Sequence, residues 1–115
     1  MNSANYNQMM AELREEYLVS FDEKFNAMRG FLEGADWYSL ELEFHKLKGT
    51  GTTYGVPEVT ELCEIMEKIC REKSQIDESL LNLAISLLSK IREKYTNGTD
   101  FDLGADPQFQ AIKNN

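Results

Sequence analysis

The chain has 115 residues, of which 42% are hydrophobic and 28% are charged, and its formal net charge is −8. This composition is typical of one soluble domain with a core that needs no disulfide or metal. The acidic balance excludes nucleic acids and anionic membranes as main partners, because these polyanions are bound through Lys and Arg. No apolar run approaches the ~20 residues of a membrane-spanning helix. The N-terminus lacks the features of a secretory signal, so we expect a cytoplasmic protein.

The cysteine and histidine content argues against a metal site. Cys63 and Cys70 are seven residues apart, which on one helix places them on the same face but about two turns apart, too far for a disulfide. A zinc site needs about four ligands, and this chain has one histidine and no C-x-x-C pair. We expect reduced, buried thiols and no bound metal.

The first expected helix is a long one that begins near Met10. Apolar residues recur there at steps of three and four, which is the helical spacing; they are Leu13, Tyr17, Phe21, Phe25, Met28 and Leu32. Gly34 is expected to end this helix by adopting the left-handed conformation, and Asp36 to cap the next one.

Three more helices are expected further along the chain. The second carries Trp37, Leu40, Phe44 and Leu47 on one side and ends around residues 54–55. The third begins at Pro57, since proline suits a first helical turn, and buries Val59, Leu62, Cys63, Met66 and Ile69. The fourth is capped by Ser74 or Asp77, ends at residues 97–98, and buries Leu80, Leu81, Ala84, Leu88, Ile91 and Tyr95.

Short connections between four helices predict an all-α fold, an antiparallel up-down-up-down four-helix bundle. We assign residues 1–97 to the bundle and expect a monomer. Residues 98–115 are polar and lack a sustained apolar stripe, so they are predicted to form a loosely ordered C-terminal tail. Four apolar residues of this tail can still dock on the bundle: Phe101, Leu103, Phe109 and Ile112.

Residues 44–55 break the local rules for a helix. The segment reads FHKLKGTGTTYG, and each glycine inside a helix costs about 1 kcal/mol relative to alanine, with further cost for the threonines. Sequences that violate local propensity tend to do so at functional sites. On a helical wheel His45 points away from the core, and its face also holds Glu41, Lys48, Gly49 and Thr52. Lys48 can neutralise an anion on the imidazole, and Gly49 leaves room for a second protein.

The segment HKLKGTGTTYG resembles the H-x-L-K-G-[ST] signature of histidine-containing phosphotransfer (HPt) domains, with a second glycine at the expected distance. The resemblance covers about residues 10–96. It implies that His45 is phosphorylated, that Lys48 is the cation beside the phosphate, and that Gly49 gives clearance to a docking receiver domain.

The third helix is expected to supply a partner for the histidine. HPt domains usually place a Gln or Glu there against Nδ1, and the matching residue is Glu67, which the helical wheel places between core and solvent. A carboxylate that accepts from Nδ1–H fixes the tautomer whose Nε2 carries the free lone pair. Arg71 and Glu64 are interpreted as solvated side chains, as is Lys46.

A contact surface for the receiver is expected around His45. Tyr38 and Leu42 are apolar residues that flank the histidine on the helical wheel. With Glu41, Gly49 and Thr52 they form the predicted partner-binding set.

The resemblance implies reversible phosphoryl transfer in a multistep two-component phosphorelay. Partners are response-regulator receiver domains or a hybrid histidine kinase, and the receiver contributes Mg²⁺, so no cofactor is expected on this chain. No nucleotide-binding loop of the G-x-G-x-x-G or G-x-x-x-x-G-K-[ST] type occurs. We therefore expect a phosphocarrier, not an enzyme with autonomous kinase activity.

Three alternatives remain beside this hypothesis. The chain can be a helical adaptor or regulator that binds its partner without phosphorylation. It can also be the phosphoacceptor domain of a larger histidine kinase, although the start at Met1 and the polar end favour a free-standing carrier. A hydrolase is disfavoured because no Ser or Cys nucleophile is placed beside the histidine.

Overall fold

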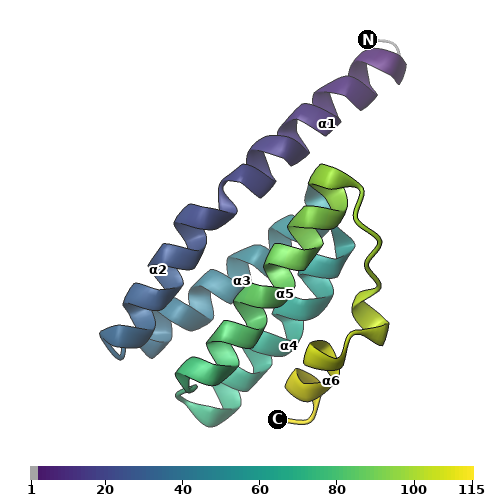
Figure 1. Ribbon diagram of the computed structural model, residues 1–115. Helices are drawn as coiled ribbons and strands as arrows, with labels where there is room; N and C mark the ends of the chain where they lie inside the picture. Colours follow the sequence, from purple (N-terminus) through teal and green to yellow (C-terminus); the bar gives the residue numbers. More distant parts are fainter. Residues whose placement is uncertain (1–2) are drawn as a thin grey trace.

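The computed structural model describes residues 3–115, and every regular element among them is helical (Figure 1). The elements in chain order are α1 (Ser3–Val19), α2 (Phe21–Glu33), α3 (Trp37–Thr53), α4 (Pro57–Lys73), α5 (Glu78–Asn97), the short 3-10 helix η1 (Leu103–Ala105) and α6 (Pro107–Lys113). None of these helices is both long enough and apolar enough to cross a bilayer.

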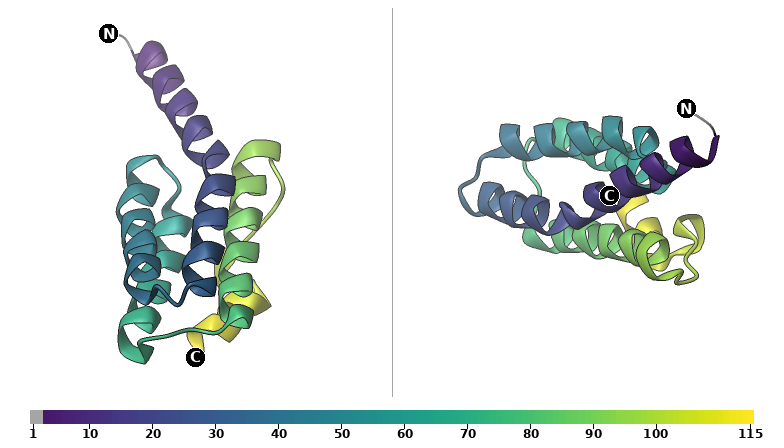
Figure 2. Two further views of the ribbon diagram at one scale, coloured as in Figure 1. Left: turned by 90° about the vertical axis from the view of Figure 1, so that its left-hand side faces the viewer. Right: turned by 90° about the horizontal axis from the view of Figure 1, so that it is seen from above.

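Helices α2 to α5 lie side by side around one hydrophobic core (Figures 1 and 2), and α3 and α4 pack most closely. The largest fully buried side chains come from all four: Phe21, Met28, Leu40, Phe44, Leu47, Leu62, Met66, Leu81, Leu87, Leu88 and Ile91, joined by Phe109 of α6. The apolar stripes seen in the sequence therefore form most of this core, except that Leu13 is exposed and Leu32, Trp37 and Tyr95 are half-buried. Cys63 and Cys70 belong to it as free thiols, as expected.

The prediction of one long first helix was wrong, because the helix is divided at Ser20. The Ser20 hydroxyl donates to the carbonyl of Tyr17 at 2.6 Å, and the Lys24 ammonium donates to the Ser20 oxygen at 2.8 Å. A serine that bonds back to its own helix in this way bends it. Helix α2 lies against the bundle, and α1 continues from it past the end of the bundle, with a bend between the two (Figures 1 and 2).

Most helix ends follow the local signals in the sequence. Asp36 and Asp77 each accept a hydrogen bond from the backbone N–H three residues on, capping α3 and α5. Pro57 is the first residue of α4, and Gly98, at φ +69°, ends α5. Local capping chemistry thus fixes where the bundle helices begin and end.

The connection between α2 and α3 differs from the expectation at one residue. Gly34 has φ −83°, and the left-handed residue is Ala35, at φ +52°. The turn is closed by backbone bonds from the N–H groups of Gly34, Ala35 and Asp36 to carbonyls of the last turns of α2.

The prediction of a loosely ordered C-terminal tail was also wrong. Residues 103–113 form η1 and α6, which pack on α5 and α4 with Leu103, Phe109 and Ile112 buried. Asp106 caps α6 and accepts from Lys90 of α5 at 3.1 Å. The apolar stripe of α6 is only two residues long, too short to register as a helical period, yet it suffices once α4 and α5 provide a surface.

Candidate functional site

His45 lies on the outer side of α3, between two core residues. Phe44 and Leu47 are fully buried and hold this turn of the helix against the core, while 58% of the His45 side chain is exposed. The orientation predicted from the helical wheel is therefore the one observed. An imidazole held on a rigid helix and open to solvent is accessible to a second protein.

Glu67 of α4 reaches across to this imidazole. Its Oε1 lies 3.1 Å from His45 Nδ1, which is the contact that the sequence led us to expect. The carboxylate is more buried than expected, with only 5% of its side chain exposed, because three neighbouring side chains contact it. These neighbours are His45, Lys48 and Arg71.

The charge state of Glu67 decides the tautomer of His45. Burial raises the pKa of Glu67, but the Lys48 ammonium and the His45 contact outweigh burial and hold this pKa below its ordinary value of 4.5. Lys48 Nζ lies 2.7 Å from Oε2, so the two side chains form an ion pair. An ionised carboxylate only accepts, so this contact is a hydrogen bond when His45 Nδ1 carries the proton, and in the neutral imidazole Nε2 then holds the lone pair.

Arg71 joins the site from one turn further along α4, which the sequence analysis missed. Its guanidinium contacts Glu67 Oε1 through Nη2 and Glu41 Oε1 through Nε, the latter at 3.3 Å. The side chain is 64% exposed, so the expected exposure was right and the missing feature was its ion pairing. The signal was present in the sequence, since a Glu and an Arg four residues apart face one another on a helix.

A shallow hollow of about 230 Å³ lies beside the imidazole. It is lined by Tyr38, Glu41, Leu42, His45, Glu67 and Arg71. Three members of the predicted partner-binding set are therefore gathered around His45, with the Tyr38 ring 73% exposed and Leu42 half-buried. Beside the imidazole, the hollow thus combines the apolar side chains of Tyr38 and Leu42 with three charged side chains.

The remaining two members of that set lie further along α3. A Cβ added to Gly49 meets nothing within 4 Å, so the surface beside Lys48 is open. Thr52 is exposed, but its hydroxyl bonds to that of Thr60 on α4 at 3.0 Å. Gly49 thus offers the predicted clearance, whereas the Thr52 hydroxyl is already engaged within the protein. Their roles in partner binding stay predictions.

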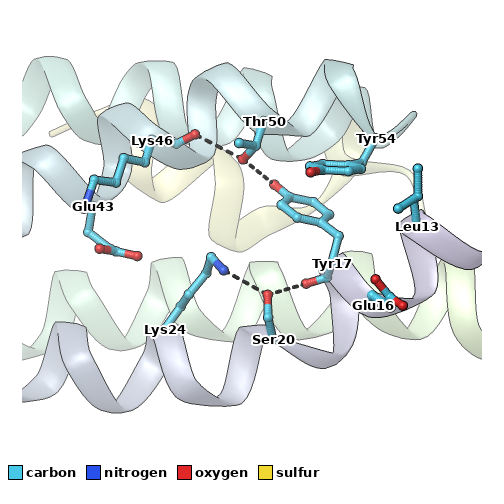
Figure 3. Close-up of a pocket in the computed structure, with 9 residues that line it drawn as sticks. All are labelled: Leu13, Glu16, Tyr17, Ser20, Lys24, Glu43, Lys46, Thr50 and Tyr54. Atoms are coloured by element: carbon cyan, nitrogen blue, oxygen red, sulfur yellow. Dashed lines mark hydrogen bonds between the residues drawn. The ribbon is translucent and has the colours of Figure 1, made fainter. Parts of the chain in front are cut away.

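A larger hollow of about 560 Å³ separates α1 and α2 from α3 and contains no residue of the His45 site (Figure 3). On one side Tyr17 bonds to Thr50 at 3.0 Å, and on the other Lys24 bonds to Ser20. Figure 3 shows these pairs bordering the space between the helices. Of these two hollows, only the smaller one is lined by the imidazole of His45, so the candidate site lies there. Among residues 3–115 no three His, Cys, Asp or Glu side chains gather as metal ligands.

Comparison with known families supplies the decisive observation. The model of the Hpt domain matches residues 12–94, well over half of the chain, including every site residue named above. The chain belongs to the Hpt domain family. Comparison with curated proteins and with solved structures gave no match. Hpt domains carry phosphoryl groups in two-component and phosphorelay signalling, and they interact with receiver domains of response regulators.

Proposed function

We propose that this Hpt domain is a relay protein that accepts a phosphoryl group on His45 from the aspartate of one receiver domain and passes it to another. The observation that carries the proposal is the pairing of an exposed imidazole with a buried, ionised Glu67 at its Nδ1. This pairing leaves Nε2 as the nucleophile on the solvent side. Within residues 3–115 no hydrogen bond occupies Nε2.

The transfer is an in-line displacement at phosphorus. The Nε2 lone pair forms the N–P bond while the P–O bond to the receiver aspartate breaks, and the aspartate leaves as a carboxylate. The Nδ1 proton stays on the ring, which becomes positively charged, and the adjacent Glu67 carboxylate stabilises that charge. Positioning and charge neutralisation provide most of the catalysis of such a step. Transfer to the next receiver is the reverse reaction with a second aspartate.

One cation near the imidazole, the Lys48 ammonium, supports phosphate binding in this proposal. Lys48, one turn beyond His45, is about one-third exposed in its side chain, and its ammonium needs only a change of rotamer to leave Glu67 for a phosphoryl oxygen. We assign no metal to this chain; Mg²⁺ is expected on the receiver.

The docking surface is proposed to be the outer side of α3 around the histidine. Its members are Tyr38, Glu41, Leu42, Gly49 and Thr52. The apolar side chains of Tyr38 and Leu42 and the open surface beside Gly49 suit a helix of a receiver domain. We further propose that α2 to α5 form an up-down-up-down antiparallel bundle that presents this surface, as a cytoplasmic monomer. Their short connections and side-by-side packing support that arrangement.

The test is transfer of label from a phosphorylated receiver domain to the wild-type chain and to His45→Gln. We expect acid-labile, alkali-stable label on the wild type and on the control Lys46→Ala, which alters an exposed neighbour outside the Glu67 pairings, and none on His45→Gln. Label that comes from a histidine kinase domain and not from any receiver favours a phosphoacceptor domain of a kinase. Receiver binding without label on either protein supports the adaptor.

A further inference from the structure

The hydroxyl of Thr60, on α4, forms hydrogen bonds with backbone groups of α3. Its Oγ1 donates to the carbonyl oxygen of Lys48 at 2.8 Å and accepts from the backbone N–H of Thr52 at 2.8 Å. These two backbone groups are four residues apart and are the pair that an α-helix joins directly. The Thr60 side chain of α4 therefore links a carbonyl and an N–H group of α3. The carbonyl belongs to Lys48, one turn after His45.

Gly51 is what admits Thr60 to this position. A Cβ at residue 51 would lie 2.5 Å from Thr60 Oγ1 and 2.7 Å from its backbone nitrogen. Real Cβ atoms do not approach so closely, and one of the two contacts is with backbone that cannot rotate away. The glycine in the middle of α3 is thus explained by the approach of α4, not by clearance for a partner.

The histidine site lies at the same contact between α3 and α4. Besides the Lys48–Glu67 ion pair, three hydrogen-bonded side-chain pairs join α3 and α4: Glu41–Arg71, His45–Glu67 and Thr52–Thr60. From one pair to the next, the residue number rises along α3 by as much as it falls along α4, first by four and then by seven. All three pairs therefore belong to one register of the two helices. Seven residues are two turns, about 10.5 Å, which places Thr60 and Glu67 on the same face of α4.

Of these pairs, Thr52–Thr60 is the one whose Thr60 hydroxyl also forms hydrogen bonds with the backbone of α3. The His45–Glu67 contact joins two side chains with several rotatable bonds, whereas Thr60 reaches the Lys48 carbonyl and the Thr52 N–H through a short, β-branched side chain. A slide of one residue between the helices is about 1.5 Å. That displacement takes the 3.1 Å His45–Glu67 contact outside hydrogen-bond range unless the side chains adjust.

We propose that Thr60 is a positioning residue for His45. Its hydroxyl fixes the register of α4 against α3, so that Glu67 meets Nδ1 and Nε2 is the free nitrogen. Thr60 does not touch the reacting atoms and acts through Glu67 and Lys48. The consequence for phosphoryl transfer rests on the proposed function, while the consequence for the imidazole tautomer does not.

The test compares variants that differ in the hydroxyl at residue 60. Thr60→Val keeps the shape and removes the hydroxyl, Thr60→Ser keeps the hydroxyl, and Thr60→Ala compared with Thr60→Ser isolates the hydroxyl if the valine variant fails to fold. Thr53→Val is the matched control, because the Thr53 hydroxyl bonds to the Gly49 carbonyl of its own helix at 3.1 Å. The readouts are the ¹⁵N shifts of the imidazole, which report the tautomer, the thermal midpoint, and the rate and affinity of transfer from a phosphorylated receiver.

We expect Thr60→Val to lower the fraction of His45 in the Nδ1–H tautomer and to slow transfer at unchanged receiver affinity. The loss should be about tenfold to a hundredfold, because a misplacement of about 1 Å at a reacting group can cost about a hundredfold. Thr60→Ser and Thr53→Val are expected to keep the wild-type tautomer and rate. A folded Thr60→Val, or Thr60→Ala, with the tautomer of the wild type would overturn the proposal even if its thermal midpoint falls. If the wild type accepts no phosphate, the proposed function fails, and the tautomer still decides the role of Thr60.

Discussion

Two glycines on α3, Gly49 and Gly51, show how one residue type meets two different needs within a single turn. Gly49 faces open solvent, and Gly51 faces the backbone of α4. The sequence marks both as anomalies in a helix, and the resemblance to HPt domains explains Gly49. The need for Gly51 was not predictable, because it arises from Thr60, a residue of another helix whose position no local pattern contains. The missed ion pairs of Arg71 were closer to prediction, since their spacing is local.

This difference predicts opposite effects of the same substitution. Gly49→Ala is expected to raise the free energy of unfolding by up to about 1 kcal/mol, because alanine is the better helix former and its methyl meets no atom. Gly51→Ala is expected to lower it by about 1–3 kcal/mol through overpacking against Thr60. Urea unfolding of the two variants beside the wild type measures both. Changes of the same sign in the two variants would show that the contact at Gly51 does not distinguish these positions.

At the scale of the elements, the sequence was most informative where capping residues act locally. Pro57, Asp77 and Gly98 mark helix ends that depend on their own side chains or backbone. The division at Ser20 was missed because a hydroxyl that bonds to its own helix leaves the apolar period unchanged. Helix α6 was missed for a different reason, since its seven residues gain their stability from docking on α5 and α4.

The docking of α6 predicts a substitution that separates stability from function. Phe109 is fully buried, so Phe109→Ala is expected to lower the free energy of unfolding by about 3–5 kcal/mol. Helix α6 contacts the side of α4 that carries Ile65 and Ile69, on the opposite face from Glu67. The rate of phosphoryl transfer at a temperature where the variant is folded should therefore equal that of the wild type. A slowed transfer in the folded variant would show that α6 contributes to the surface used for phosphoryl transfer.

For the molecule as a whole, three carboxylates with largely buried side chains connect neighbouring helices. Glu67 connects α4 to α3, Glu58 connects α4 to α5 through Lys94 and Tyr95, and Asp106 connects the start of α6 to α5. Burial raises the pKa of each, and the bonds from the cationic and hydroxyl partners outweigh burial, so all three pKa values lie below their ordinary values. Composition and charge predict a soluble acidic domain, but not which of its twenty acidic residues are structural.

These lowered pKa values predict acid sensitivity. Each carboxylate contributes stability that is fully present above its ordinary pKa, 4.5 for Glu and 3.8 for Asp, and is lost as the pH falls through the lower pKa of the folded state. The free energy of unfolding should therefore be nearly constant just above this window and should fall progressively with decreasing pH below it. Urea unfolding across this window measures the slope, and Glu67→Gln should make it shallower. An unchanged slope in that variant would mean that Glu67 has an ordinary pKa in the folded protein.

In the proposed function, Glu67 leaves Nε2 of His45 as the atom that is phosphorylated. The most direct measurement is NMR of the chain phosphorylated by phosphoramidate, with ¹⁵N-labelled imidazole, because this small donor requires no receiver domain. We expect one phosphorus–nitrogen coupling, at Nε2 of His45, with the proton retained on Nδ1. Coupling at Nδ1 would overturn the proposed role of Glu67, since Glu67 could not then hold that nitrogen, and phosphate at any other residue would overturn the assignment of His45.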